Sequence, residues 1–237
     1  MAFEQHMLED CEENMALANP NEENQLSGLA VIIPIRSFAN GKTRLGPIPY
    51  QSKAEIIRII AKYILDAASP IERFVISSDL GVEAWATSLG VSTLKDNGDL
   101  NTTLRGATNL LYKQGYRRCA IVLGDIPLLR HQDVLDVLGH GDFAIITDRN
   151  HEGTNVMAFD LPLSIQLSYG RSSLASHRAL IEESGAKCEV LQRIYPCYDI
   201  DTQGDIVSLG KLIRDDPKLP SDLHERIQTI LSVLGHK

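Results

Sequence analysis

The spacing of hydrophobic positions along the chain predicts strands that alternate with helices. Short runs rich in apolar residues are typical of strands buried in a sheet, and they occur at residues 29–35, 74–77, 91–94, 119–123, 142–147, 154–159 and 188–191. Apolar residues at helical spacing predict helices over residues 52–68, 82–89, 103–114, 132–138, 174–184, 203–213 and 223–234. This alternation predicts an α/β fold, with a mainly parallel sheet covered by helices on both sides.

The segments that directly follow the predicted strands are where chemistry is expected. In open α/β sheets, ligands bind beyond the carboxyl ends of the strands. Here these segments are residues 36–45, 77–79, 95–101, 124–127, 148–155 and 199–202. We therefore searched them for charged and polar side chains that could bind a ligand.

The loop after the first predicted strand carries three cations, Arg36, Lys42 and Arg44. Gly41-Lys42-Thr43 resembles the end of an ATPase P-loop, but that motif needs a glycine where this chain has Arg36. The P-loop interpretation therefore fails. Cations and backbone amides on a glycine-containing loop still suit a triphosphate, and a solvated basic loop is the alternative.

Carboxylates follow two other predicted strands. Asp125 comes after the most hydrophobic run, where it could bind a hard cation such as Mg²⁺ or cap the following helix. Asp199 and Asp201 project to one face if the segment is extended, and two adjacent carboxylates repel each other unless a cation lies between them. Asp201 or Thr202 could instead cap the helix from residue 203. Three carboxylates suit Mg²⁺ rather than zinc.

His177 falls within the predicted helix over residues 174–184. A lone histidine on a helix is more often a packing or solvent-exposed residue than a catalytic one. We therefore do not assign it as a general base.

The acidic residues are unevenly distributed. Residues 1–27 contain seven acidic residues and no lysine or arginine, whereas the remaining body has 24 acidic and 23 basic residues. We expect residues 1–27 to be a solvated, flexible arm, with a helix packed on a neighbouring subunit as the alternative. The remaining residues, 28–237, fit one domain.

Composition excludes several classes of protein. The nearly neutral body lacks the basic stripe of a nucleic-acid surface. No run of 18 apolar residues is present and the N-terminus does not read as a secretory signal, so neither a membrane span nor secretion is expected. The four cysteines lack metal-binding spacing, which is typical of reduced thiols in a cytoplasmic protein.

Six motifs in order resemble the 2-phospho-L-lactate (or phosphoenolpyruvate) guanylyltransferase family of coenzyme F-420 biosynthesis. They cover most of the body and lie at residues 33–45, 99–104, 124–127, 148–155, 169–177 and 199–202. The resemblance implies a GT-A-like, Rossmann-related nucleotidyltransferase fold. It also implies transfer of GMP from GTP to a phosphorylated three-carbon acid, with release of pyrophosphate and with Mg²⁺ or Mn²⁺ as cofactor.

The resemblance assigns roles to individual residues. Lys42 and Arg44 match the triphosphate-binding loop that begins at Arg36, and Leu100 and Asn101 match the segment beside the guanine base. The metal-binding aspartates correspond to Asp125, Asp199 and Asp201, and the acceptor-binding positions to Thr154, Gly170 and Ser173. Lys42, Arg44 and Asp125 would be the catalytic residues. A homodimer is a further expectation from the family.

The chain departs from the family at one motif. The usual Phe-Gly-Pro-Gly-Ser reads Tyr-Gly-Arg-Ser-Ser at residues 169–173, which places Arg171 and Ser172 beside the expected acceptor site. The acceptor therefore stays open among 2-phospho-L-lactate, phosphoenolpyruvate and 3-phosphoglycerate. The alternative functions are a molybdenum-cofactor guanylyltransferase, a sugar-phosphate cytidylyltransferase, or a non-catalytic nucleotide-binding regulator.

Overall fold

Each predicted strand and helix is present in the computed structural model, with ends that differ by a few residues. The structure describes residues 26–38, 45–46, 48–96 and 98–235. The strands are β1 (Leu29–Pro34), β2 (Glu72–Ser77), β3 (Ser92–Lys95), β4 (Arg118–Val122), β5 (Phe143–Thr147), β6 (Thr154–Asp160) and β7 (Cys188–Val190). The helices are α3 (Tyr50–Ala68), α4 (Leu80–Ser88), α5 (Leu100–Lys113), α6 (His131–Gly139), α7 (Ser173–Glu183), α8 (Gln203–Asp215) and α9 (Ser221–Val233).

The strands form one mixed sheet in the order β3-β2-β1-β4-β6-β5-β7. β1 pairs in parallel with β2 and β4, and β5 pairs in parallel with β7. β6 runs antiparallel to both β4 and β5. The prediction of a mainly parallel sheet is therefore confirmed. The reversed β6 also brings its first residues to the edge where β4 and β5 end.

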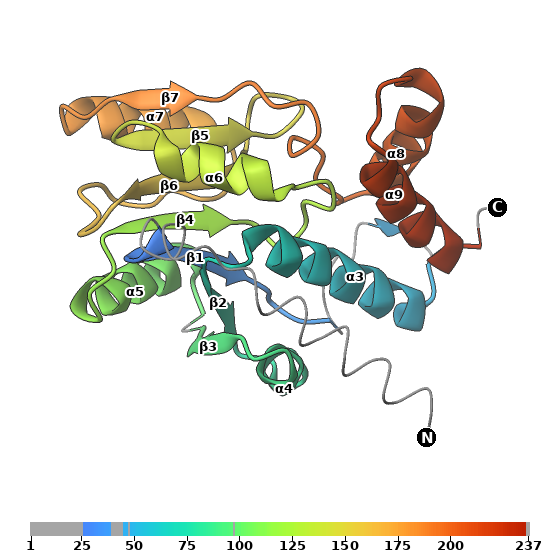
Figure 1. The fold of residues 1–237 in the computed structure, drawn as a ribbon, viewed down its shortest axis with the longest axis horizontal. Coiled ribbons are helices and arrows are strands. Elements are labelled where there is room, and N and C mark those ends of the chain that lie inside the picture. Colours follow the sequence, from blue (N-terminus) through green and yellow to red (C-terminus); the bar gives the residue numbers. More distant parts are fainter. Residues whose placement is uncertain (1–25, 39–44, 47, 97, 236–237) are drawn as a thin grey trace.

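Helices cover both faces of the sheet, which explains why its central strands are apolar throughout. Along β1, Val31 and Ile33 face the core beneath α3 and α6, whereas Ala30 and Ile32 face the core beneath α5 and α7. Successive side chains of a strand point to opposite faces, so a strand with a core on each side must be apolar at every position. Figure 1 shows α3 and α6 on one face and α5 on the other.

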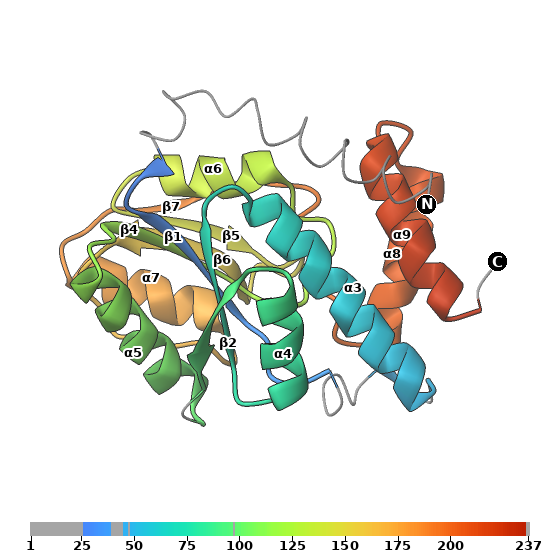
Figure 2. The same cartoon turned by 60° about the horizontal axis from the view of Figure 1, so that its bottom comes forward.

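The C-terminal helices extend the molecule beyond the sheet. α9 packs against α8 and against α3, and both C-terminal helices lie beside one end of α3 (Figure 2). Buried Leu223, Ile227 and Ile230 of α9 lie four and three residues apart, which is the spacing of one helical face. No helix within the described residues is long and apolar enough to cross a membrane.

Candidate active site

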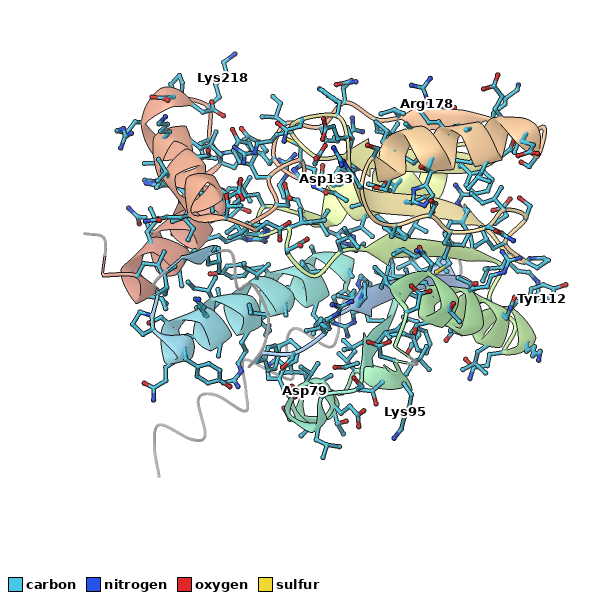
Figure 3. All side chains as sticks on the ribbon, turned by 180° about the vertical axis from the view of Figure 1, so that it is seen from behind. Asp79, Lys95, Tyr112, Asp133, Arg178 and Lys218 are labelled. Atoms are coloured by element: carbon cyan, nitrogen blue, oxygen red, sulfur yellow. The ribbon has the colours of Figure 1, made fainter. Side chains whose placement is uncertain are left out.

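The segment after β1 is anchored by the neighbouring strand and helix. The Arg36 carbonyl accepts a hydrogen bond from the Ser77 hydroxyl (3.5 Å), and Ser37 donates to Asp79 at the N-terminus of α4. Asp79, labelled in Figure 3, also caps α4 by accepting from the backbone N–H groups of Gly81 and Val82. These contacts fix the start of the predicted phosphate-binding loop at Arg36.

Gly124 brings Asp125 against the end of β1. A Cβ atom on Gly124 would lie 2.7 Å from the Pro34 carbonyl oxygen, so no other residue fits there without displacing the strand. The next α-helix, α6, has Arg130 at its N-cap. The interpretation of Asp125 as the cap of the following helix is therefore wrong, and its carboxylate lies at the carboxyl edge of the sheet.

Three hydrogen bonds bring residues 196–201 to this edge. The Ile200 N–H donates to the Asp125 carbonyl over 3.0 Å. The buried Asn155 amide donates to the Pro196 carbonyl over 3.2 Å, while the Asn155 carbonyl accepts from the Leu123 N–H (3.0 Å). Segments more than 70 residues apart in the sequence thus meet at the end of β4.

The carboxylates of this group influence one another. Burial, together with the negative charges of Asp125 and Asp201, raises the pKa of Asp199 to about 6. A raised pKa of this kind means that the site disfavours another negative charge. The structure therefore brings Asp199 close enough to Asp125 and Asp201 for their charges to interact, although residues 199–201 lie outside any strand.

Helix capping at this position is provided by residues next to Asp201. Thr202 is the N-cap of α8, and the Asp205 carboxylate accepts from the backbone N–H groups of Asp201 (3.1 Å) and Thr202 (2.7 Å). Of the two residues proposed as caps, Thr202 takes the position. Arg149 forms an ion pair with Asp205 and lies over the Tyr198 ring, which ties the end of β5 to this helix.

The carboxylates of Asp125, Asp199 and Asp201 offer the oxygen ligands that a hard divalent cation prefers. Within the described ranges, no set of three or more His, Cys, Asp or Glu side chains is already arranged as a metal site. Mg²⁺ is commonly bound by one or two carboxylates together with substrate phosphates and waters, so a complete protein cage is not needed. Burial and the charges of Asp125 and Asp201 both raise the pKa of Asp199, and a bound cation would offset both.

A cavity of about 230 Å³ lies between the end of β1 and the N-terminus of α5. Arg36, Leu100 and Asp125 line it, as does Asp96. Two predicted nucleotide-binding residues and one predicted metal ligand therefore share one cavity. The sequence analysis did not single out Asp96, although this residue lies in a searched strand-end segment.

Asn101 does not line this cavity. Its amide forms a pair of hydrogen bonds with the backbone of Tyr169, accepting from the N–H over 2.7 Å and donating to the carbonyl over 3.1 Å. The side chain predicted to lie beside guanine therefore joins α5 to the loop before α7.

The predicted acceptor residues Thr154 and Ser173 meet in a buried polar cluster. The Ser173 hydroxyl donates to Thr154 Oγ1 over 3.2 Å, and His177 Nδ1 lies 3.0 Å from the same oxygen. All three side chains are buried. Burial lowers the pKa of His177 to about 4, so the imidazole is neutral at pH 7.

The start of α7 differs from the prediction. The helix begins at Ser173, and its N-cap is Ser172 in the left-handed conformation, without a side-chain capping bond. Ser173 is therefore not the cap, because its hydroxyl bonds to Thr154. Gly170 is exposed and has a φ of 142°, a conformation that favours glycine.

Some predicted residues lie outside the described residues, among them Lys42 and Arg44 of the phosphate-binding loop. The residues that the sequence analysis left without a role are Asp96 in the cavity, His177 in the polar cluster and Asn155 between β4 and residues 196–197. The position of Asp96 after a strand was the available signal. For His177 and Asn155, only the packing reveals the contacts.

Two solved structures illustrate the similarity of the fold to other proteins. A nucleotide-diphospho-sugar transferase from Desulfovibrio desulfuricans G20, so described provisionally, aligns with a TM-score of 0.69 at 16% identity, over 88% of this chain and 97% of its own. A 4-diphosphocytidyl-2C-methyl-D-erythritol synthase from Anaerococcus prevotii aligns with a TM-score of 0.53 at 12% identity, over 78% and 98%. At these identities the similarity establishes the nucleotidyltransferase fold alone.

Sequence relatives are more specific. A 2-phospho-L-lactate guanylyltransferase from Methanothermobacter thermautotrophicus is 31% identical, over 77% of this chain and 82% of its own. A phosphoenolpyruvate guanylyltransferase from Conexibacter woesei is 30% identical, over 77% of this chain and 87% of its own. Another, from Chloroflexus aggregans, is 26% identical, over 73% of this chain and 92% of its own. The family described as "Guanylyl transferase CofC like" matches residues 29–215. This chain is therefore a nucleotidyltransferase that belongs to the family of CofC-like guanylyl transferases.

Proposed function

We propose that this protein transfers the guanylyl group of GTP to a phosphorylated three-carbon acid in coenzyme F-420 biosynthesis, with release of pyrophosphate. The observation that supports the proposal is the cavity of about 230 Å³ at the carboxyl edge of the sheet, which Arg36 and Asp125 line together. Asp125 belongs to the aspartate group (Asp125, Asp199 and Asp201). The N–H of Leu123, which lines the cavity, bonds to the Asn155 backbone carbonyl, and Thr154 of the polar cluster is the residue before Asn155 on β6. The names of the relatives support 2-phospho-L-lactate or phosphoenolpyruvate as the acceptor, with 3-phosphoglycerate as a third candidate.

The proposed reaction is an in-line displacement at phosphorus. A phosphate oxygen of the acceptor forms a bond to the α-phosphorus of GTP. The bond from that phosphorus to the oxygen bridging to the β-phosphorus breaks, and pyrophosphate leaves with the electron pair. Because the nucleophile is already an anion at neutral pH, no general base is needed.

The main obstacle is the repulsion between two polyanions, which residues of this chain must reduce. Arg36 lines the cavity, where its cation would attract the triphosphate. By the family resemblance, Lys42 and Arg44 would stabilise the departing pyrophosphate. Asp125, Asp199 and Asp201 would bind Mg²⁺, or Mn²⁺, which neutralises charge on the phosphate oxygens when bound.

Asp96 is our candidate for selecting guanine. Asp96 Oδ1 accepts hydrogen bonds from the Gly98 N–H and the Thr103 hydroxyl, both over 2.9 Å, and these bonds fix the carboxylate at the cavity. Guanine presents N–H donors at N1 and N2, which a carboxylate accepts, whereas adenine has an acceptor at N1. A mismatched polar edge costs about 1–3 kcal/mol for each unpaired group, which favours GTP over ATP.

The test is a panel of nucleotides and acceptors scored by pyrophosphate release. GTP, ATP, CTP and xanthosine triphosphate (XTP) are combined with phosphoenolpyruvate, 2-phospho-L-lactate and 3-phosphoglycerate, with Mg²⁺ present. We expect release with GTP and one of these acids. Preferential use of CTP, or no release with any acid, would refute the proposal.

The Asp96→Asn variant sharpens the assignment of the base. Asparagine keeps the shape of aspartate but offers a donor to the C2 carbonyl of xanthine. We expect kcat/KM for GTP to fall by about tenfold or more and the ratio of XTP to GTP use to rise. If the ratio does not change, Asp96 does not contact the base.

A further inference from the structure

His177 is fully buried, and both of its ring nitrogens are engaged. The Ser168 backbone N–H donates to Nε2 over 2.9 Å, while Nδ1 lies 3.0 Å from Thr154 Oγ1. The Tyr169 ring packs edge-on against the imidazole, with ring centroids 4.9 Å apart. Partners at both nitrogens, from two other segments, fix the orientation of the imidazole ring.

These contacts determine which nitrogen carries the proton. A backbone N–H can only donate, so Nε2 must offer its lone pair to Ser168. A neutral imidazole with an unprotonated Nε2 carries its proton on Nδ1. His177 therefore donates from Nδ1 to Thr154 Oγ1.

The same reasoning sets the direction of the Thr154 hydroxyl. A hydroxyl oxygen has two lone pairs and one proton. Thr154 Oγ1 accepts from His177 on one side and from the Ser173 hydroxyl on the other, over 3.0 and 3.2 Å. With both lone pairs used, the Thr154 hydroxyl acts toward a ligand as a donor, which suits an anionic group.

We propose that His177 is a positioning residue that acts through Thr154, holding the threonine hydroxyl so that its proton points to an anionic oxygen of the acceptor. The inference rests on the proposed function, because it needs a phosphorylated acid beside Thr154. His177 does not touch the acceptor itself. Its hydrogen bonds go to β6 and to the segment just before α7, so we expect its main effect on the acceptor side of the reaction.

Two substitutions separate the contacts of the imidazole. In His177→Asn the side-chain amide reaches the place of Nδ1 and can still donate to Thr154, but it loses the bond from Ser168. In His177→Gln the amide reaches the place of Nε2 and can still accept from Ser168, but it loses the donation to Thr154. The two variants remove the same ring and one hydrogen bond each, so each is the control for the other.

The measurement is the KM of each substrate in both variants, alongside the melting temperature. We expect His177→Gln to raise the KM of the acceptor by about tenfold, the effect of one lost hydrogen bond. The acceptor KM of His177→Asn should stay close to the wild-type value. The KM of GTP should be unchanged in both variants. In a Thr154→Val background, where the hydroxyl is absent, the difference between the two variants should vanish.

A structural role alone predicts another pattern. The acceptor KM would then change in step with the melting temperature. The two variants would be equally impaired, or His177→Asn would be the more impaired. Either result, with an active wild type, overturns the inference but not the proposed function. A wild-type protein that uses none of the acids overturns the proposed function and this inference with it.

The tautomer provides a readout that does not depend on activity. Nitrogen-15 NMR of histidine-labelled wild-type protein distinguishes a protonated from an unprotonated ring nitrogen. We expect the proton on Nδ1 of His177 without any substrate present. A proton on Nε2 would overturn the inference.

Discussion

The aspartate group (Asp125, Asp199 and Asp201) and the hydroxyl–imidazole cluster (Thr154, Ser173 and His177) lie at the same edge of the sheet but differ in their electrostatics. In the cluster, neutral side chains form hydrogen bonds with one another inside the protein. In the aspartate group, burial and the neighbouring negative charges raise the pKa of Asp199. A polar group that is internally satisfied stabilises the fold, whereas one under repulsion has free energy to gain from a ligand.

The two groups should therefore respond differently to substitution. Removing a charge from the aspartate group should harm the reaction and spare stability. Altering the cluster should affect stability as well as acceptor use.

The largest effect is expected for Asp125→Asn. If Asp125 binds Mg²⁺, turnover should fall by at least about a hundredfold, while the melting temperature stays the same or rises because repulsion with Asp199 is reduced. Pyrophosphate release and thermal unfolding measure the two properties. A chelator should abolish activity in the wild type, and added Mg²⁺ or Mn²⁺ should restore it. Near-normal turnover of the variant would exclude the metal assignment.

The pH dependence of stability should have opposite signs for the two groups. The folded-state pKa of His177 is lowered to about 4. The neutral imidazole therefore contributes its full share of the unfolding free energy above its ordinary pKa of about 6.5, and this share is lost as the pH falls toward 4. The folded-state pKa of Asp199 is raised to about 6. Its contribution to the unfolding free energy is therefore present below its ordinary pKa of about 3.9, and it is lost as the pH rises through 6.

Urea unfolding between pH 4 and 7 measures both contributions. His177→Asn should reduce the loss of unfolding free energy on acidification by up to about 3 kcal/mol. The wild type should lose unfolding free energy as the pH rises and Asp199 ionises, and Asp199→Asn should not show this loss. Mg²⁺ should also reduce the loss in the wild-type protein. Identical pH profiles for the wild type and both variants would contradict these assignments.

A smaller effect is expected at Arg171, where the chain departs from its family. The side chain is exposed and lies next to Gly170. If its cation reaches the acceptor, Arg171→Gly should change the preference among phosphoenolpyruvate, 2-phospho-L-lactate and 3-phosphoglycerate by a few fold, with GTP use unaffected. An unchanged preference among the three acids would mean that Arg171 has no part in specificity.

The smallest effect is expected from removing the acidic N-terminal residues. Leu26 packs against the core, so the truncation should end at residue 25 rather than at 27. Deleting residues 1–25 removes seven acidic residues but no broad apolar face. We expect kcat/KM and the melting temperature to stay nearly constant. A large drop in melting temperature would show that these residues pack on the body or on another subunit.

The sequence by itself determined the elements of this protein and the segments that carry chemistry. Strands buried on both faces must be apolar at every position, as β1 is, and amphipathic helices repeat their apolar residues every three or four positions, as α9 does. Both patterns are local and can be read from the chain. Asp125 was predicted as a site residue because it follows a buried strand, and Asp199 because it pairs with Asp201, whereas Thr154 was assigned by the resemblance to the family.

Only the tertiary structure decided how side chains distant in the sequence are paired. Asn101 bonds to the Tyr169 backbone instead of lining the cavity, Ser173 bonds to Thr154 instead of capping α7, and His177 joins Ser168 to Thr154. A hydrogen bond depends on distances within a few tenths of an ångström between atoms on different elements. Those distances are set by strand order and helix packing, which no local pattern encodes.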